Sequence, residues 1–412
     1  MTENNRAYKK GFDKITWGIL IATFVLCSMG IVALYSASYS AEGPFFQRVV
    51  GRQLIWIIVG IISAIIVSMF RSKLIYNYSY FLYGAGIVLI LLPYFFPASE
   101  GAKRWITVGV FQYQPSEIMK ILSVIAIAKY FTNTNISKSD FKIIFFPLTM
   151  ILIPTGIVMN QPDLGTAMIY IGLLFPMMFW AGVDWINIFL LVAPLISILS
   201  AFNYYTFFIW LIIFAIVIYF QHYQLWKKII LTIANVSLGL LSPVLWDQLQ
   251  PYQQQRILTL FNVKTDPQGA GYQVIQSQVA IGSGGLFGKG LLQGKQTHLK
   301  FLPEQKTDFI FSVIGEEWGF IGVSLVLLSY FFLIYFGIKA AYNSRDQYNS
   351  IVIIGLVSII FYHVIINTSM TIGLMPVTGL PLPFISYGGS FLTTCCILLG
   401  LLFGMKKESK YY

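Results

Sequence analysis

Charge is scarce in this sequence. Only 10% of its 412 residues are charged, whereas 57% are hydrophobic. Because a soluble domain carries about a quarter charged residues, most of the surface of this protein must face something other than water. The formal net charge is +11, yet no long basic run or nucleic-acid motif accompanies it. The balance therefore indicates anionic membrane lipids or an anionic lipid substrate as partners, and no nucleic acid.

Cysteine and histidine are also scarce, and neither is spaced as a set of metal ligands. The three cysteines are odd in number and lie in apolar runs without a CxxC pair, which excludes a disulfide framework. The three histidines are scattered and show no HExxH spacing. These residues are Cys27, Cys395, Cys396, His222, His298 and His363. We expect no dedicated metal site, although an acidic cavity can hold a divalent cation such as Mg²⁺ beside a pyrophosphate.

A nucleotide-binding loop is absent as well. The glycine-rich tract at residues 281–290 contains Gly288-Lys289, but a P-loop requires a glycine five residues earlier, where Ser283 stands. The surrounding sequence shows no strand-to-helix pattern of a dinucleotide fold. We therefore expect these glycines to allow a tight outer loop close to the membrane.

Long apolar runs make up most of the sequence. Each is about 17–25 residues long, which is enough to cross a bilayer as a helix. The runs are too long and too evenly apolar for the alternating strands of a membrane barrel. The first has a basic flank, as a signal peptide has, but its length and the runs after it indicate a retained helix. Twelve spans are predicted, at residues 15–37, 53–70, 76–96, 114–131, 143–160, 163–182, 185–201, 204–220, 227–246, 308–340, 350–372 and 385–404.

Lysine and arginine in the short loops predict the orientation, because they gather on the cytoplasmic side of a membrane protein. Residues 101–113, 247–308 and 376–383 then face outward, and long loops such as 247–308 cross largely regardless of charge. Residues 1–412 are predicted to form a single polytopic membrane domain, with 247–308 as its large extracytoplasmic loop. The residues assigned to the cytoplasmic side are Arg6, Lys9, Lys10, Lys14, Arg71, Lys73, Lys138, Lys142, Lys227, Lys228, Arg345, Lys406, Lys407 and Lys410.

An acid stands where the polar loop 247–308 returns to hydrophobic helix. Asp308 closes this loop and opens the tenth predicted span, so its carboxylate lies at the border between water and lipid. A base at that border is placed to activate a hydroxyl on a lipid-linked substrate. Asp308 is therefore the candidate catalytic residue.

Three further ionisable residues lie in predicted spans, where charge is costly and marks functional candidates. Glu117 and Lys120 share one helical face at the start of the fourth span, and Asp163 lies in the first turn of the sixth. One interpretation is structural, namely an ion pair together with acids that cap helix starts. The other is functional. In that case these positions and Asp308 meet near the outer face and line one polar cavity.

Two arginines next to the outer ends of spans permit two interpretations. Arg104 precedes Trp105 just outside the fourth span, and Arg52 lies at the start of the second. Both can anchor the protein at the interface, as snorkelling arginine and interfacial tryptophan do. Alternatively, each guanidinium grips a phosphate, for which its planar fork is well shaped.

Seven stretches together resemble one family, the SEDS proteins (shape, elongation, division and sporulation), and specifically their RodA type. No single stretch is specific, but they follow the family order and extend over nearly the whole chain. They are residues 101–105 (GAKRW), 114–120 (QPSEIMK), 161–166 (QPDLGT), 266–272 (DPQGAGY), 276–285 (QSQVAIGSGG), the interrupted stretch 302–304 and 307–311 (LPE and TDFIF), and 379–389 (GLPLPFISYGG).

The resemblance implies an all-α polytopic membrane protein of the SEDS fold with about 10–12 membrane-spanning helices. It further implies a peptidoglycan glycosyltransferase of cell elongation. Such an enzyme polymerises lipid II, a disaccharide-pentapeptide on undecaprenyl pyrophosphate, at the outer face of the bacterial cytoplasmic membrane. The implied partner is a class B penicillin-binding protein, a single-span transpeptidase.

The family's functional residues can be carried over position by position. Its essential acid matches Asp308, and its intramembrane Glu, Lys and Asp match Glu117, Lys120 and Asp163. Two positions depart from the family pattern. Lys306 stands where His is common and Gln305 where Arg is common, which can change how the acid is tuned or how phosphate is held.

The family reaction converts an α-linked sugar pyrophosphate into a β-1,4 link, which is a single inversion. It needs a base for the acceptor's 4-hydroxyl, and we expect Asp308 in that role. The departing pyrophosphate needs cations rather than an acid. We expect Arg104 and Lys120, with Arg52 or Lys306, to supply them, while Glu117 and Asp163 orient Lys120.

Two other classes of function remain open from the sequence. A flippase that carries a lipid-linked sugar across the membrane also has many spans and intramembrane charges. The matched motifs cluster on the outer side, however, whereas a flippase should need polar residues along its whole path. The third class is a structural protein that only activates a transpeptidase.

Overall fold

The computed structural model of the chain describes residues 13–39, 49–97, 103–108, 111–137, 140–221, 223–248, 254, 258, 270–299 and 301–408. Gly101, Ala102, His222 and most of the stretch 249–269 lie outside the described residues. So do several of the basic residues used for orientation, such as Arg6 and Lys138.

Each of the twelve predicted spans corresponds to a helix, so the all-α prediction is confirmed. The described residues contain two further α-helices: α10 (Ser242–Asp247) directly follows the ninth of these twelve, and α12 (Ala270–Ser283) lies in the outer loop. A single helical turn, α13 (Lys295–His298), follows α12. The twelve are α1 (Lys14–Ala37), α2 (Val49–Ser68), α3 (Ser72–Leu91), α4 (Pro115–Asn133), α5 (Phe145–Asn160), α6 (Leu164–Trp180), α7 (Trp185–Ser200), α8 (Tyr204–Tyr219), α9 (Leu225–Leu240), α14 (Ile310–Tyr342), α15 (Gln347–Thr371) and α16 (Gly389–Glu408).

The helices are those of a multi-pass membrane protein. Seven in the described part of the chain are long and apolar enough to cross a membrane, counting the short 3-10 helices η2 (Leu92–Phe95) and η3 (Phe141–Ile144) with α3 and α5. Helices α6, α7 and α8 are apolar but only 16 or 17 residues long. The sheet found in the described residues is a hairpin of β1 (Ile106–Val108) and β2 (Phe111–Tyr113), with Thr107 opposite Gln112.

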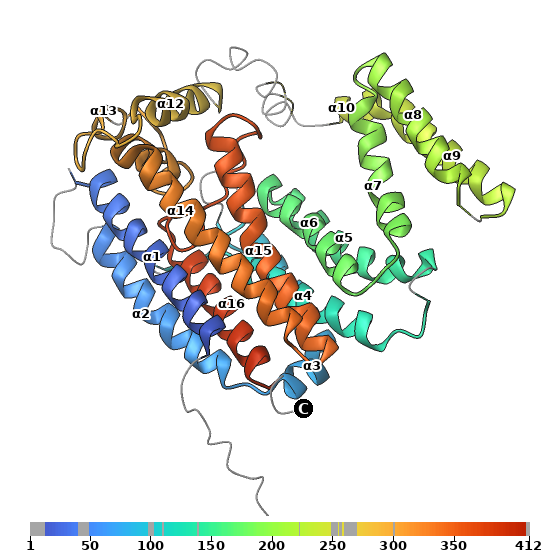
Figure 1. The fold of residues 1–412 in the computed structure, drawn as a ribbon, viewed down its shortest axis with the longest axis horizontal. Helices are drawn as coiled ribbons and strands as arrows, with labels where there is room; N and C mark the ends of the chain where they lie inside the picture. Colours follow the sequence, from blue (N-terminus) through green and yellow to red (C-terminus); the bar gives the residue numbers. More distant parts are fainter. Residues whose placement is uncertain are drawn as a thin grey trace, which may run out of the picture.

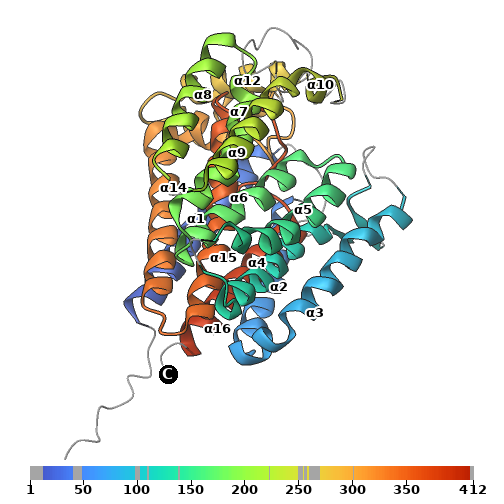
Figure 2. The same cartoon turned by 90° about the vertical axis from the view of Figure 1, so that its right-hand side faces the viewer.

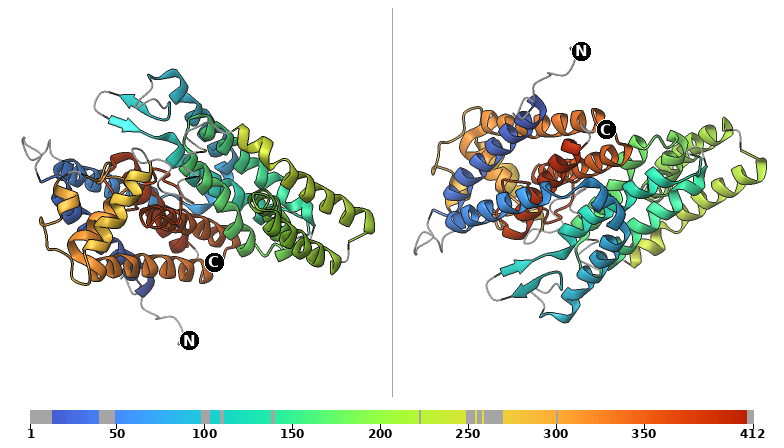
Figure 3. Two further views of the ribbon diagram at one scale, coloured as in Figure 1. Left: turned by 90° about the horizontal axis from the view of Figure 1, so that it is seen from above. Right: turned by 90° about the horizontal axis from the view of Figure 1, so that it is seen from below.

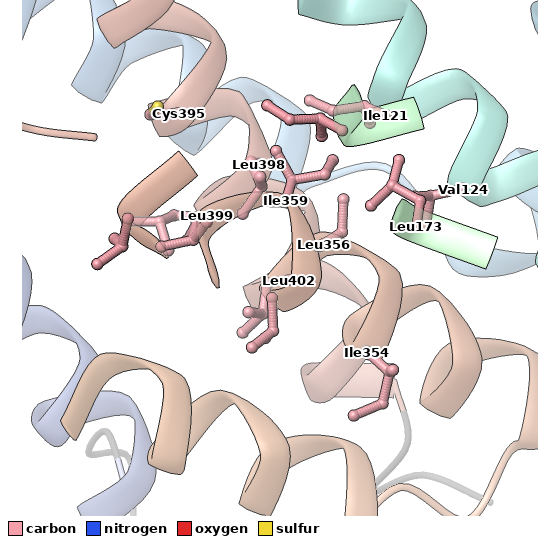
Figure 4. Packing of buried hydrophobic residues seen from close by; sticks show 14 of the residues in the cluster. Ile121, Val124, Leu173, Ile354, Leu356, Ile359, Cys395, Leu398, Leu399 and Leu402 are labelled. Carbon is pink, nitrogen blue, oxygen red and sulfur yellow. The ribbon is translucent and has the colours of Figure 1, made fainter. Parts of the chain in front are cut away.

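Helix α15 lies in the middle of the main bundle. It packs against α4, α6, α14 and α16, and most of its residues are buried. Figure 4 shows Leu356 and Ile359 of α15 between the apolar side chains of α4 and α6 on one side and those of α16 on the other. Around this centre α1 packs along α14, and α2 packs along α16 (Figure 1). Because α15 is buried on most of its sides, any polar side chain on it must find a hydrogen-bond partner inside the protein.

One end of the bundle carries the outer elements and the other carries the chain ends. Helices α12 and α13 lie at the end where α14 starts, whereas α1 starts and α16 ends at the opposite end (Figures 1 and 2). Side chains of α12 fix this arrangement. The Ser277 hydroxyl lies 2.6 Å from both the Ser312 hydroxyl and the Thr371 carbonyl oxygen, and the Gln278 amide donates to Ile372 O at 2.9 Å.

The glycine-rich tract docks into a break within α14, which the sequence did not predict. Gly319 has φ +61°, outside the helical region. The backbone of the tract takes over the hydrogen bonds: Phe320 N donates to Gly285 O at 2.9 Å, and Gly290 N donates to Glu317 O at 3.0 Å. A side chain at Gly288 would collide with the backbone of α14. The expected tight outer loop is thus inserted into the helix itself.

Helices α7, α8 and α9 form a side group next to α5 and α6 (Figure 3). They pack mainly on one another, around a small apolar cluster that includes Leu190, Trp210 and Phe214. A buried polar chain runs through this group, since Trp210 donates to Ser197 at 2.7 Å and Ser197 donates to Asn235 at 2.8 Å. The remaining faces of α8 and α9 expose apolar side chains, as lipid-facing helices do.

Candidate active site

Asp308 is held by a turn that leads into α14. Glu304 has φ +49°, and its carbonyl oxygen accepts the backbone N–H groups of Thr307, Asp308 and Phe309 at 3.1–3.2 Å. Phe309 is fully buried in a small cluster with Val274 of α12. The Asp308 side chain itself is partly exposed. The turn therefore fixes the backbone of the acid while the residue stays partly exposed.

Asn367 of α15 ties Asp308 to the segment before α16. Its side-chain amide donates to Asp308 O at 2.8 Å and to Leu380 O at 2.7 Å. The next residues of that segment are held to the same turn, because Tyr387 N donates to Lys306 O at 2.9 Å. One buried amide thus sets the distance between the backbone of the acid and residues 379–383.

The segment opposite Asp308 contains two residues with unusual backbone angles. Gly379 has φ +72°, and a side chain there would meet Asp308 Oδ2 at 3.4 Å. Phe384 has φ +67° and is buried, a conformation that costs energy for any residue other than glycine. Strain of this kind persists only where the surrounding structure imposes it, and it is common at functional sites.

Lys120 is fully buried and makes two close polar contacts. Its ammonium lies 2.8 Å from Glu117 Oε2 and 2.8 Å from Nε2 of His363, which is also fully buried. Because an ammonium can only donate, Nε2 of His363 accepts, and its Nδ1–H donates to Pro381 O at 3.1 Å. The structural interpretation of Glu117 and Lys120 as an ion pair therefore holds.

This burial also changes the expectation for Lys120. An ammonium without solvent access cannot contact a phosphate in the described conformation, so Lys120 can affect the substrate there only through its neighbours.

Asp163 caps α6, as the structural interpretation states, and it also joins the buried network. Its Oδ1 accepts from Thr166 N at 3.0 Å, and its Oδ2 accepts from the Gln114 amide at 2.7 Å. Gln114 N in turn donates to the Ser390 hydroxyl of α16 at 3.2 Å. Asp163 is therefore connected to the start of α4, where Glu117 lies.

Tyr113, at the end of β2, lies beside this network. Burial and then the nearby Glu117 carboxylate raise the pKa of Tyr113 above its ordinary value, so its phenol is neutral and can donate. The three predicted positions Glu117, Lys120 and Asp163 do meet. Asp308 is connected to them only indirectly. Asn367 donates to Asp308 O and to Leu380 O, and His363, which contacts Lys120, donates to Pro381 O.

The candidate cations differ in what surrounds them. Arg104 is partly buried, and its Nε has no hydrogen-bond partner among the described residues. Arg52 is exposed on α2, whereas its neighbour Gln53 is buried and donates to Ser386 O at 3.2 Å. Lys306 is partly exposed, two residues before Asp308. Arg104 is thus the candidate whose unmet hydrogen-bonding capacity best fits an anionic ligand.

The described residues do not form a protein-held metal site. Among them, no group of three or more His, Cys, Asp or Glu side chains is arranged to hold a metal ion. A divalent cation such as Mg²⁺ that arrives with a pyrophosphate stays a prediction, and the mechanism below uses no step through it.

The sequence reasoning missed His363, Asn367 and Gln53. His363 and Asn367 are four residues apart on one face of an apolar span, and polar residues in such a span are functional candidates. That signal was present. Their partners, Lys120 and Asp308, could not be read from the sequence because they are 243 and 59 residues away.

This fold is that of the SEDS class of membrane proteins, as comparison with known proteins shows. The family model described as "Cell cycle protein" (FtsW, RodA and SpoVE) matches residues 17–206 and 192–411. The chain therefore belongs to the FtsW/RodA/SpoVE family.

Its relatives include proteins named for peptidoglycan synthesis. Peptidoglycan glycosyltransferase RodA of Treponema pallidum is 32% identical over 95% of this chain and 98% of its own length. Peptidoglycan glycosyltransferase MrdB of Escherichia coli is 32% identical over 100% of this chain and 98% of its own. Stage V sporulation protein E of Bacillus subtilis is 34% identical over 95% and 97%.

Solved structures share the fold. One chain of a structure described as the structural coordination of polymerization and crosslinking by a peptidoglycan synthase complex superimposes with a TM-score of 0.72. It is 28% identical over 95% of this chain and 97% of that chain. The rod shape determining protein RodA of Thermus thermophilus gives a TM-score of 0.63 at 25% identity, over 97% and 98% of the two chains.

Proposed function

We propose that this protein is a peptidoglycan glycosyltransferase that polymerises lipid II during cell elongation, with Asp308 as its general base. Membership in a family whose relatives are named peptidoglycan glycosyltransferases supports the activity. The observation that carries the role of Asp308 is its placement. A turn and Asn367 fix its backbone, while its partly exposed carboxylate faces the strained segment at Gly379.

The protein lies in the bacterial cytoplasmic membrane with the α12 end facing outward. The distribution of lysine and arginine supports this orientation, because the opposite end carries residues such as Lys73, Lys142 and Lys407. Lipid II then approaches within the bilayer, with its sugars at the start of α14 and its prenyl chain against apolar helices.

In the reaction, the Asp308 carboxylate accepts the proton of the acceptor's 4-hydroxyl as this oxygen attacks the anomeric carbon of the donor. The bond from that carbon to the pyrophosphate oxygen breaks with inversion, and undecaprenyl pyrophosphate leaves as an anion. Arg104, with Arg52 or Lys306, stabilises the developing negative charge. The buried network of Glu117, Lys120 and Asp163 acts indirectly, by holding α4, α15 and residues 379–383 in place.

A class B penicillin-binding protein is the partner of this enzyme. The solved synthase complex supports this assignment, since its description couples polymerization to crosslinking and one of its chains shares the present fold.

Purified protein incubated with lipid II tests the role of Asp308. Asp308→Asn keeps the size of the side chain but removes the base, and we expect polymer formation to fall by about 10²–10⁴-fold. Asp184→Asn is the matched control, because Asp184 is an exposed acid at the start of α7 whose side chain makes no capping hydrogen bond. Equal glycan yield from the Asp308 variant and the control would remove Asp308 from catalysis.

The same preparation separates this function from the alternatives. Reconstituted in vesicles with labelled lipid II, the protein should form polymer without a second protein. Flipping of lipid II without polymer would support transport instead. Neither polymer nor flipping, from folded protein with or without a transpeptidase, would support the structural alternative.

A further inference from the structure

A cavity of about 440 Å³ lies between the main bundle and the α7–α9 side group. It is bounded by the start of the η3–α5 segment, by α7, and by the turn and first residues of α9. The cavity lies at the starts of α5 and α9, and its two lysines, Lys142 and Lys227, are among the residues that the charge distribution assigns to the cytoplasmic side. The cavity is therefore separate from Asp308 and its network, and the proposed function leaves it without a role.

The walls of the cavity are divided into an apolar part and a charged rim. Leu190, Ile230 and Leu231 supply apolar surface, whereas Lys142 and Lys227 are exposed lysines on opposite sides of the cavity. Lys227 lies over the Trp226 ring at 5.5 Å from its centroid, and Trp226 also lines the cavity. Tryptophan and lysine are the residues that typically lie at the level of lipid headgroups.

An acid, Asp140, also lines the cavity. Its Oδ1 accepts from Lys142 N at 3.0 Å and so caps η3, and its negative charge offsets part of the positive rim. Asp184 lies near Tyr223 at the start of α7. Burial and then this carboxylate raise the pKa of Tyr223, which therefore remains a neutral hydrogen-bond donor. The cavity thus offers two ammonium groups, one carboxylate and a phenol beside an apolar wall, with a net positive charge.

We propose that this cavity binds one anionic phospholipid, with Lys142 and Lys227 contacting its phosphate and an acyl chain lying on Ile230 and Leu231. Basic pockets between membrane helices on the cytoplasmic side are a recurring kind of site for anionic headgroups. The exposed apolar face of α9 continues from the cavity along the helix through Ile229 and Ile233, which gives the acyl chain a path. A free phosphate has no apolar group that could pack against that wall.

The bound lipid would join the side group to the bundle. Phe141 packs against the main apolar core and also against the small cluster of α7 and α8, and the cavity lies beside it. A ligand that contacts both sides binds only when they are docked, so it stabilises that arrangement by mass action. We expect the midpoint of thermal unfolding to rise with the lipid.

Native mass spectrometry of the purified full chain tests the site, with dioleoyl-phosphatidylglycerol or dioleoyl-phosphatidylcholine added to the detergent. The test variant is Lys142→Gln with Lys227→Gln. The control is Lys73→Gln with Lys339→Gln, which removes the same charge from two other exposed lysines. We expect the test variant to bind phosphatidylglycerol about 30-fold more weakly than wild type, and the control to bind like wild type.

Three results would overturn the proposal. The first is equal loss of phosphatidylglycerol binding in test and control variants, which would reduce the effect to general charge. The second is equal retention of phosphatidylcholine by the wild-type protein. The third is a rise in thermal midpoint with glycerol 1-phosphate as large as that with phosphatidylglycerol, because the apolar wall would then play no part. A misfolded test variant is recognised by its elution in gel filtration, and Lys142→Gln alone then takes its place.

Discussion

Helices α15 and α8 are both strongly apolar, but α15 is mostly buried whereas α8 is mostly exposed. Helix α15 is buried on nearly all sides and uses His363 and Asn367 to bind other elements. Helix α8 fully buries only Trp210, Phe214 and Ile218, one residue per turn, and most of its other side chains are exposed. Hydrophobicity alone therefore does not separate the centre of a membrane protein from its edge.

The difference lies in where polar groups are placed. In hydrocarbon a polar side chain must find a partner inside the protein, so it belongs on a helix surrounded by other helices. The side group has such a contact too, between Ser197 and Asn235, but it connects only α7 and α9. The contacts of α15 connect α4, α14 and residues 379–383. Matched substitutions in the two regions test whether this distinction governs stability and activity.

The largest effect is expected at the buried lysine. Lys120→Met leaves the Glu117 carboxylate buried without its cation, which costs about 3–5 kcal/mol of stability. Lys228→Met is the control in the side group, where an exposed ammonium donates to Tyr219 O at 2.7 Å and lies over the Tyr219 ring, and we expect a loss of about 1 kcal/mol or less. Thermal unfolding in detergent measures both. Similar losses for the two lysines would show that the centre and the edge do not differ.

An asparagine in each region separates activity from stability. Asn367→Ala leaves the Asp308 and Leu380 carbonyl groups without their donor, at a cost of about 1–3 kcal/mol. Because Asn367 holds the backbone of Asp308, its loss should destabilise the position in which the carboxylate can act as the base. We therefore expect kcat for lipid II polymerisation to drop about 10–100-fold while KM changes little. Asn235→Ala should lower the unfolding midpoint and leave kcat per folded molecule unchanged. Loss of kcat in the Asn235 variant, or none in the Asn367 variant, contradicts the assignment.

Glycines at close helix contacts should show the smallest difference. A methyl group at Gly355 of α15 would collide with Val124 and approach Met177 Sδ at 3.1 Å, both buried in the main core. Gly355→Ala should therefore cost about 1–3 kcal/mol, as overpacking does. At Gly239 of α9 the methyl group would meet the ring of Phe207, which is only half-buried and can turn away. Gly239→Ala should cost less, and an equal or larger fall in unfolding midpoint would show that the side group is packed as tightly as the core.

The helices could be predicted because each apolar run carries its own signal. A segment with no polar partner in lipid must satisfy its backbone internally, so length and hydrophobicity suffice. The pairing of Glu117 with Lys120 was also predictable, since a spacing of three residues places them on one helical face. The break of α14 at Gly319 was not, because the hydrogen-bond partners at that point come from the glycine tract more than twenty residues earlier.

The candidate site was predictable only in part. Asp308, Asp163, Glu117 and Lys120 were chosen because charge in a span is rare, and the structure brings the last three together. That Lys120 has no solvent access could not be predicted, since its burial depends on helices α15 and α16, which come far later in the chain. The roles of these residues in catalysis remain predictions until the variants are measured.

By itself, the sequence determined that the chain is a multi-pass membrane protein, roughly where its apolar helices lie, and which acids lie near their ends. Those properties follow from local composition, because lipid acts on each segment separately. The tertiary structure alone decided which apolar helix became the centre, which side chains reach Asp308 and Lys120, and where a cavity remained between the bundle and the side group. Those outcomes depend on contacts between distant segments, and no local pattern encodes which of them will meet.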